Sequence, residues 1–310
     1  MKPNLRVKIG SIELKNPVLA ASGTFGYGDE YADLIDIEGL GGFVTKAITL
    51  LPREGNAPPR TVETPAGMLN SIGLENVGVE AFIAEKLPFL HGLETAVIVN
   101  IAGSTVEEYV EVTRRLSECD GIDGFELNIS CPNVSKGGLA FGSSPETVSE
   151  VVSATRASTR LPLIVKLTPN VTDIAPIARA AEDSGADAIS LINTLVGMAV
   201  DVQTRRPKLA SVTGGLSGPA IKPVALAMVW KATQTVRIPI IGIGGILNTM
   251  DALEFLISGA SAVQVGTGNF VDPRCTMKII DGLEHFCEEN HIAKISDLVG
   301  SLQLSTGGAG

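Results

Sequence analysis

A regular alternation of short apolar runs with helix-like segments constrains the fold of this chain most strongly. The apolar runs lie at residues 17–21, 42–46, 96–100, 124–129, 163–167, 188–192, 238–243 and 262–265. The helix-like segments lie at residues 29–37, 76–89, 105–118, 145–159, 173–184, 219–235, 249–258 and 273–289. Continuous apolar runs are typical of parallel strands that are buried on both faces. Eight such units, with no charged or Pro/Ser-rich linker between them, predict an α/β protein with a single (β/α)₈ TIM barrel.

Three segments fall outside this alternation. Residues 5–14 alternate between apolar and polar as a short N-terminal β-hairpin does, with its turn at Gly10-Ser11. Residues 47–75 have no sustained period and are rich in Pro, Gly, Arg and Thr, and residues 193–218 form a second long strand-end loop. Because a long irregular stretch inside a compact domain is usually functional, we expect 47–75 to be a functional loop.

Composition excludes several classes of function. Lys plus Arg total 24 against 34 Asp plus Glu, a net charge of -10 that argues against nucleic acid or an anionic membrane as the main partner. Apolar runs fall short of the roughly 18 residues that cross a bilayer, and the N-terminus lacks a signal-peptide core, so we expect a cytoplasmic protein. The four Cys have no C-x-x-C spacing, which argues against a metal site held by this chain alone. We expect one barrel domain over residues 1–304 and a disordered tail at 305–310.

Polar residues follow most of the predicted strands. They are Ser22 and Thr24, Lys46, Asn100, Asn128 and Cys131, Lys166, Asn193 and Thr194. One polar residue at a strand end needs no special explanation, but two Lys and three Asn emerging from buried strands would be costly without partners. Because the carboxyl ends of parallel strands meet at one edge of a barrel, this pattern predicts a ligand site there.

Glycine-rich motifs follow the last two strands, IGIGGI at 241–246 and QVGTGNF at 264–270. Such glycines let backbone N–H groups approach a phosphate. Neither is a P-loop or a complete GxGxxG, but together they favour a phosphate-bearing cofactor or substrate. Lys166 is a second clue, because a buried Lys needs an anionic partner. That partner is either an Asp or Glu of the barrel or a reduced flavin ring, and the phosphate motifs favour the flavin.

The segment GFELNISCPNVSKGGLAFG, at 124–142, places Cys131 where a strand gives way to a Gly-rich loop. Free Cys is among the most buried residue types, so Cys131 is either a structural core residue or a functional group at the barrel edge. The segment by itself leaves both interpretations open. The three His residues lie far from every motif, which strengthens Cys131 as the candidate general base.

With these residues assembled, the sequence resembles dihydroorotate dehydrogenase, an FMN-dependent enzyme family of pyrimidine biosynthesis, over nearly the whole chain. The most specific matches are NISCPNVSKGGLAFG (128–142), PRTVETPAGMLNSIGLEN (59–76), INTLVGMAVDVQTRRPKL (192–209) and GGLSGPAIKP (214–223). Cys131 at the base position resembles class 1, since class 2 has Ser there. The GGLAFG, TRRP and GGLSGPAIKP segments are similar to type 1B.

This resemblance implies two sets of site residues. The FMN would be held by Ser22, Lys46, Ala47, Asn100, Asn128, Lys166, Ile192, Gly218, Gly244, Gly245, Gly266 and Thr267. Dihydroorotate would lie against Lys46, Asn70, Ser71, Ile72, Gly73, Leu74, Asn128, Asn133, Asn193 and Thr194. Cys131 and Lys166 would be the catalytic residues, with Cys131 as general base at C5 of the substrate and FMN N5 as acceptor of the hydride from C6.

The resemblance to type 1B also implies partners. In that type, two FMN barrel subunits and two electron-transfer subunits form a heterotetramer. The electron-transfer subunit carries FAD and a [2Fe–2S] cluster and passes electrons to NAD. The absence of cluster-type Cys spacing here is consistent with a cluster in another chain.

Several alternatives remain at this point. A class 1A enzyme would be a homodimer that uses fumarate instead of NAD. A related flavin barrel that acts on uracil or thymine would have His after the Pro of the Cys131 motif, where this chain has Asn133. A phosphate-binding barrel isomerase or aldolase without flavin, and a scaffold without enzymatic activity, are the remaining hypotheses, although the scaffold leaves the strand-end Lys and Asn residues unexplained.

Overall fold

The computed structural model describes residues 2–130, 135–136 and 139–304. Within them, eight parallel strands close into a barrel in the order β11-β12-β17-β18-β3-β4-β7-β8. The strands are β3 (Val18–Ala20), β4 (Gly42–Val44), β7 (Ala96–Ile101), β8 (Gly124–Asn128), β11 (Leu163–Lys166), β12 (Ala188–Leu191), β17 (Ile240–Ile243) and β18 (Ala262–Val265). The eight predicted apolar runs therefore form the eight barrel strands, and the predicted TIM barrel is confirmed.

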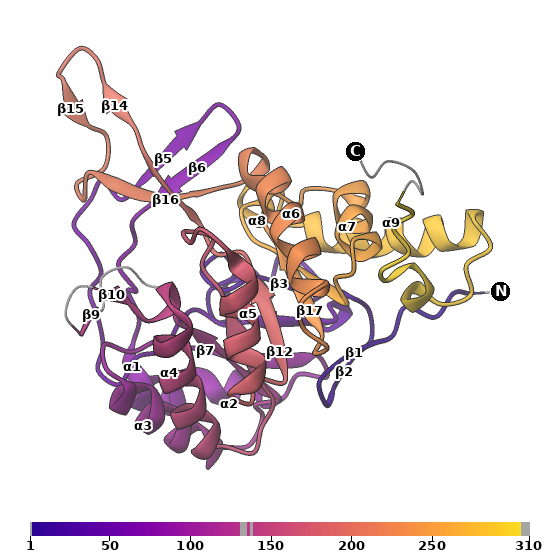
Figure 1. The fold of residues 1–310 in the computed structure, drawn as a ribbon, viewed down its shortest axis with the longest axis horizontal. Helices are drawn as coiled ribbons and strands as arrows, with labels where there is room; N and C mark the ends of the chain where they lie inside the picture. Colours follow the sequence, from indigo (N-terminus) through magenta and orange to yellow (C-terminus); the bar gives the residue numbers. More distant parts are fainter. Residues whose placement is uncertain (1, 131–134, 137–138, 305–310) are drawn as a thin grey trace.

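Helices surround the barrel (Figure 1). They are α1 (Gly78–Ala81), α2 (Leu87–Leu90), α3 (Val106–Ser117), α4 (Pro145–Ala157), α5 (Ile174–Asp183), α6 (Lys222–Thr233), α7 (Thr249–Ile257), α8 (Gly268–Val271) and α9 (Cys275–Glu289). A π-helical turn over Phe82–Lys86 joins α1 to α2. Polar caps begin several helices: in α4, the Ser144 hydroxyl accepts from the Thr147 N–H, and Pro145 lies in the first turn.

Two helical predictions need correction. The segment 29–37 is not one helix but contains the short 3₁₀ turn Asp29–Tyr31, and a second turn, Ile37–Gly39, begins at its end. Ile35 and Ile37 reach the core without a continuous helix, whereas Leu34 is exposed, so the segment does not bury a single helical face. The short helix α8, directly after the β18 strand, is absent from the helix-like segments of the sequence.

The N-terminal hairpin closes the amino end of the barrel. Its strands β1 (Val7–Ile9) and β2 (Ile12–Leu14) pair antiparallel, as predicted. A Cβ placed on Gly10 would lie 3.1 Å from the Cβ of Asp187, immediately before β12, and Ile12 packs against Gly124 at the start of β8. The hairpin therefore lies at the end opposite to the one where the strand-end polar residues gather.

The two long loops are more ordered than the sequence suggested. They contain β5 (Thr61–Thr64), β6 (Gly67–Asn70), β13 (Leu195–Met198), β14 (Val200–Asp201), β15 (Arg206–Pro207) and β16 (Thr213–Ser217). Strands β13, β16, β6 and β5 form one antiparallel sheet, in which Gly215 pairs with Asn70. Figure 1 shows this sheet and the β14–β15 hairpin projecting from one side of the barrel. The irregular loops expected at 47–75 and 193–218 thus combine into a second sheet.

Other expectations concern the ends of the chain and membranes. The domain boundary at residue 304 stays a prediction, and the expected tail, 305–310, lies outside the described residues. In the part of the chain that the structure describes, no helix has both the length and the apolar character needed to span a bilayer.

Candidate active site

A cavity of about 450 Å³ opens where the carboxyl ends of the barrel strands face the second sheet. This volume lies within the range of small-molecule sites. One side, the barrel wall, is lined by Ser22, Asn128, Lys166, Ile192, Gly244, Gly245, Gly266 and Thr267. The other side, the loop wall, is lined by Met68, Asn70, Ser71, Ile72, Gly73, Leu74, Thr194, Val196, Thr213, Gly214, Gly215 and Ser217. The cavity thus lies at the edge that the strand-end residues predicted.

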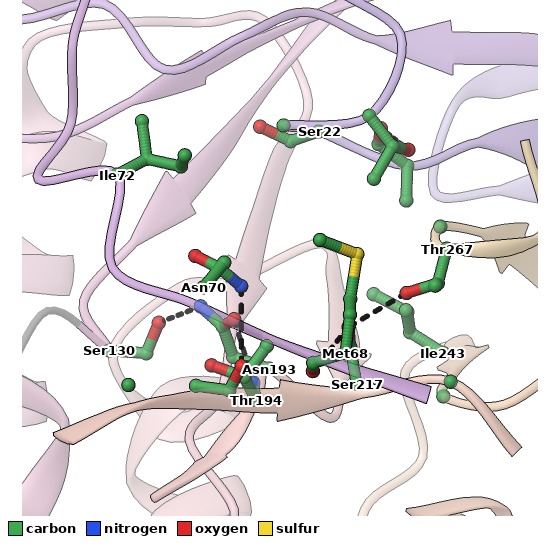
Figure 2. A pocket seen from close by; sticks show the side chains of 18 of the residues that line it. Ser22, Met68, Asn70, Ile72, Ser130, Asn193, Thr194, Ser217, Ile243 and Thr267 are labelled. Carbon is green, nitrogen blue, oxygen red and sulfur yellow. Dashed lines mark hydrogen bonds between the residues drawn. The ribbon is translucent and has the colours of Figure 1, made fainter. Parts of the chain in front are cut away.

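Glycines shape the barrel wall after β17. Gly244 and Gly245 have φ angles of 130° and 73°, a region that favours glycine over residues with a Cβ. A Cβ on Gly245 would lie 2.9 Å from the Gly218 carbonyl oxygen. After β18, the Thr267 hydroxyl donates to the Ser217 hydroxyl at 2.8 Å, which joins the barrel wall to the loop wall (Figure 2). Backbone atoms therefore form the cavity surface after β17 and β18.

A chain of amide and hydroxyl groups crosses the floor of the cavity. The Ser130 hydroxyl donates to Asn128 Oδ1 at 2.6 Å. The same hydroxyl accepts from Asn193 Nδ2 (Figure 2). Asn193 Oδ1 in turn accepts from the Thr194 N–H at 2.8 Å. Each of these groups is oriented by its neighbour, so their remaining donors and acceptors are fixed in direction. Such a row suits a ligand with several amide edges.

The loop wall carries a buried hydroxyl that is not paired within the protein. Ser71 Oγ is buried and has no hydrogen-bond partner among the described residues. Asn70 Nδ2 donates to the Gly215 carbonyl at 3.4 Å, which links β6 to β16 across the sheet. Buried hydroxyls are normally paired, so Ser71 Oγ is expected to meet a ligand or water.

Three charged side chains lie at the mouth of the cavity. Lys46 Nζ is 3.8 Å from Glu75 Oε2, and the same oxygen accepts from Arg60 at 2.5 Å. Lys46 and Glu75 both line the cavity, and their side chains are 30% and 38% exposed. Lys46 therefore offers a positive charge that is only partly compensated, which suits an anionic ligand group.

Lys166 has an anionic partner within the barrel. Its Nζ lies 3.2 Å from Glu126 Oε1, and both side chains are buried. Lys166 therefore does not need a flavin as its counter-charge, because the alternative, a salt bridge inside the barrel, is present. Lys166 nevertheless lines the cavity, in register with Asn128 of the neighbouring strand.

The structure brings most of the predicted site residues together. Those that line the cavity are Ser22, Lys46, Ala47, Asn128, Lys166, Ile192, Gly218, Gly244, Gly245, Gly266, Thr267, Asn70, Ser71, Ile72, Gly73, Leu74, Asn193 and Thr194. Asn100 is fully buried and does not line the cavity; its Nδ2 donates to Glu126 at 2.7 Å. Cys131 and Asn133 lie outside the described residues. The three His, all of them in the described part of the chain, do not line the cavity.

Sequence reasoning missed several residues of the site. Met68 reaches the cavity from β6, and Thr213 and Gly215 reach it from β16, the strand that pairs with β6. Glu126 was also missed, although a charged residue inside an apolar run was a signal for it.

The cysteines in the described part of the chain are poor candidates for a reactive thiol. Burial raises the pKa of the Cys275 thiol to about 11, and burial also raises the pKa of Cys119 and of Cys287. Because the thiolate is the reactive form, these three residues are largely unreactive near neutral pH. Across all the residues that the structure describes, no cluster of three or more His, Cys, Asp or Glu could hold a metal ion.

Comparisons with known proteins agree with this geometry. The family model described as dihydroorotate dehydrogenase matches residues 4–287. The chain is 58% identical over 303 residues to a protein of Pelobacter propionicus, covering 98% of this chain and 100% of the relative. It is 58% identical over 304 residues to one of Desulforamulus reducens, with 98% and 100% covered. Both relatives are named dihydroorotate dehydrogenase B (NAD(+)), catalytic subunit, in agreement with the type 1B motifs. The chain therefore belongs to the dihydroorotate dehydrogenase family.

Proposed function

We propose that this chain oxidises dihydroorotate to orotate in de novo pyrimidine biosynthesis, with FMN as the bound cofactor. The observation that carries the proposal is a cavity whose parts differ in chemistry. The barrel wall presents glycines and backbone groups after the last two barrel strands, the floor carries a row of amides and hydroxyls, and Lys46 places a positive charge at the mouth. Family membership adds the reaction.

The residues of the barrel wall fit FMN. Gly244 and Gly245 line the cavity with φ angles that favour glycine, and a Cβ on either would collide with neighbouring residues, so the backbone itself forms this surface, as a phosphate site requires. A Cβ on Gly266 would lie 3.8 Å from the Cβ of Ala21, its nearest neighbour beyond the adjoining residues, so this part of the wall leaves open space. Lys166 adds a positive charge at the cavity surface. FMN, when bound, supplies the two-electron acceptor for the oxidation.

The loop wall and the floor of the cavity would orient the substrate. Dihydroorotate carries a carboxylate and several amide edges. Lys46 can bind the carboxylate, while Asn70, Asn128 and Asn193 each offer both a donor and an acceptor. Asn193 is held by Ser130 and by the Thr194 N–H, so its amide is pre-oriented before the substrate enters.

Proton removal from C5 of the substrate is assigned to Cys131. Residue 131 directly follows Ser130, which lines the cavity. A free thiol has a pKa of roughly 8.5, so only a small fraction is thiolate at neutral pH unless the site lowers this value. A base works only when deprotonated, and the rate of substrate oxidation is therefore expected to rise with pH up to the pKa of Cys131.

The electron-transfer partner and the location in the cell extend the proposal. The relatives are named as catalytic subunits of an NAD(+)-linked enzyme. We infer a second subunit that carries FAD and a [2Fe–2S] cluster, in an assembly of two catalytic and two electron-transfer subunits in the cytoplasm. Co-purification with such a subunit, followed by iron and flavin analysis, tests this part.

A turnover assay tests the reaction itself. The FMN-reconstituted chain is supplied with dihydroorotate and an artificial dye as electron acceptor, with dihydrouracil as the control substrate. Dye reduction with dihydroorotate and not with dihydrouracil is expected. Activity with dihydrouracil alone would identify a pyrimidine-reductase relative instead. Fumarate in place of the dye tests the class 1A alternative, in which fumarate alone would support turnover.

A further inference from the structure

Glu126 is a fully buried carboxylate inside the barrel, below the floor of the cavity. It lies on β8 two residues before Asn128 and accepts hydrogen bonds at both oxygens. The donors are Asn100 Nδ2 at 2.7 Å and Lys166 Nζ at 3.2 Å on Oε1, and Ser190 Oγ and Gln264 Nε2, both at 2.8 Å, on Oε2. These donors come from strands β7, β11, β12 and β18, so Glu126 connects opposite sides of the barrel.

The hydrogen-bond partners of Glu126 suit a carboxylate group. Three of its partners, the Lys ammonium and the two amide NH₂ groups, can only donate. A proton on the carboxyl group could be accepted only by the fourth partner, the Ser190 hydroxyl, so donors dominate around both carboxyl oxygens. Turning either amide over would instead place its oxygen against the carboxylate. The cluster therefore holds one negative and one positive charge at a depth where barrels are usually filled with apolar side chains.

A buried ion pair is an inefficient way to stabilise a barrel, because both charges must be taken out of water. Its position suggests another role. Lys166 is the member of the cluster that reaches the cavity surface, whereas Glu126 is completely enclosed behind it. Glu126 thus acts on the cavity in two ways: it fixes the direction of the Lys166 ammonium group, and its own negative charge, just behind the cavity surface, offsets part of the positive charge there.

We propose that Glu126 is a positioning residue that holds Lys166 and lowers the reduction potential of the bound flavin. This inference rests on the proposed function, since it requires a flavin in the cavity. A reduced flavin carries negative charge and is favoured by a nearby cation. The charge of Lys166 alone would favour reduction strongly, and the carboxylate behind it weakens that effect. A lower reduction potential of the flavin matters because the reduced flavin must pass its electrons on to the next acceptor.

The substitution Glu126→Gln tests the proposal because it removes the charge and keeps the shape. The new amide oxygen can still accept from Lys166. Gln264 can turn its own amide to meet the new NH₂ group, since Gln264 Oε1 has no partner among the described residues. The equilibrium constant for two-electron reduction of bound FMN should rise at least tenfold, a positive shift of about 30 mV. The measurement is a redox titration of the FMN-loaded protein, read from its visible spectrum.

Two control variants separate charge from structure. Ser190→Ala removes one hydrogen bond to the carboxylate but keeps its charge, and should change the equilibrium constant less than twofold. Glu111→Gln makes the same chemical change at an exposed carboxylate that pairs with Arg114 and Arg115, where solvent screens the charge, and should leave the potential unchanged. A shift in the controls as large as that of Glu126→Gln would overturn the proposal.

A second pair of variants applies if Glu126→Gln does not fold. Lys166→Gln should lower the equilibrium constant for reduction of bound FMN at least tenfold. The double variant, Glu126→Gln with Lys166→Gln, should have a higher equilibrium constant than Lys166→Gln alone. The double variant holds no unpaired buried charge, which favours its folding. A double variant with the same potential as Lys166→Gln would overturn the proposal.

The outcomes distinguish this inference from the proposed function. If the wild-type chain binds FMN and is reduced by dihydroorotate while Glu126→Gln has an unchanged or lower potential, only the role of Glu126 is wrong. If the wild-type chain takes up no FMN, the proposed function fails and this inference fails with it.

Discussion

The two walls of the cavity are built in different ways. The barrel wall consists of strand ends whose side chains and glycines are held by the closed barrel, and Lys166 is anchored there by a buried ion pair. The loop wall consists of strands that are short, half exposed and paired over long sequence distances, as Asn70 and Gly215 are. A closed barrel fixes a cofactor, whereas a sheet on long loops can adapt to a small substrate that enters and leaves.

This difference predicts that the two walls bind different ligands, which mutation can test. Changes in the barrel wall should affect FMN binding, and changes in the loop wall should affect the KM for dihydroorotate while FMN stays bound. The chemical step itself is expected at Cys131, whose motif directly follows the barrel strand β8.

The largest effect is expected at Cys131. Cys131→Ala should slow reduction of the flavin by dihydroorotate by on the order of 10² to 10⁴, because the base at C5 is lost. FMN content should not change, since Cys131 is not among the residues proposed to hold the cofactor. Rapid mixing under anaerobic conditions measures the rate. Loss of FMN with this substitution would instead assign Cys131 a structural role.

Alkylation identifies the reactive thiol independently. The pKa of Cys275 is raised to about 11 and the pKa values of Cys119 and Cys287 are also raised, so at pH 8 these thiols stay mostly protonated. Iodoacetamide at pH 8 should therefore modify Cys131 first, and orotate should slow the reaction. Peptide mapping gives the site. Faster modification of any of the other three cysteines would contradict this assignment.

Gly245→Ala tests the barrel wall. Its φ of 73° and a Cβ position 2.7 Å from the Lys222 Cβ would strain the backbone by about 1–3 kcal/mol. FMN affinity of the apoprotein should fall roughly tenfold to a hundredfold. Gly92→Ala is the matched control, because the nearest atom to its Cβ is 3.8 Å away and its affinity should equal that of the wild type. Unchanged FMN binding in Gly245→Ala would remove these glycines from the cofactor site.

Gly215→Ala tests the loop wall. The added Cβ would collide with the side chain of Thr194, so this residue must move out of place. The KM for dihydroorotate should rise on the order of tenfold, the effect expected from overpacking one position. FMN affinity should stay within about twofold of the wild type by the same reasoning. A fall in FMN affinity with an unchanged KM would show that the loop wall contributes to FMN binding and not to substrate binding.

Glu75→Gln should have the smallest effect. Glu75 partly compensates Lys46 and would repel a substrate carboxylate, so its neutralisation should lower the KM for dihydroorotate by about twofold to threefold at low salt. Salt screens exposed charges, and the difference should vanish at about 1 M salt. Steady-state kinetics at two ionic strengths measures it. A higher KM would mean that Glu75 itself helps to hold the substrate.

The same two walls explain what could be predicted from the sequence. The barrel wall follows from local patterns: an apolar run predicts a buried strand, and the residues after it must lie at the barrel edge, as Asn128 and Gly244 do. The pairing of Asn70 with Gly215 joins residues 145 positions apart, and neither segment has a period that reveals it. The sequence therefore indicates only loops where the structure has a second sheet.

Lys166 and Glu126 show a different limit. The sequence indicated that Lys166 needs an anionic partner but not which one, because the register between neighbouring strands β8 and β11 decides which side chains meet inside the barrel. Register within the barrel, which sequence alone does not supply, identifies Glu126 as a partner of Lys166. The predicted helix at 29–37 failed for a simpler reason, since apolar spacing over one or two turns does not distinguish a short helix from separate 3₁₀ turns.

Anaerobic addition of dihydroorotate to the FMN-loaded chain tests the central claim most directly, because it requires both walls to hold their ligands against each other. The visible spectrum is recorded while substrate is added. Bleaching of the flavin band is the predicted result. A flavin band that persists in excess dihydroorotate would contradict the claim that this cavity brings FMN and dihydroorotate together.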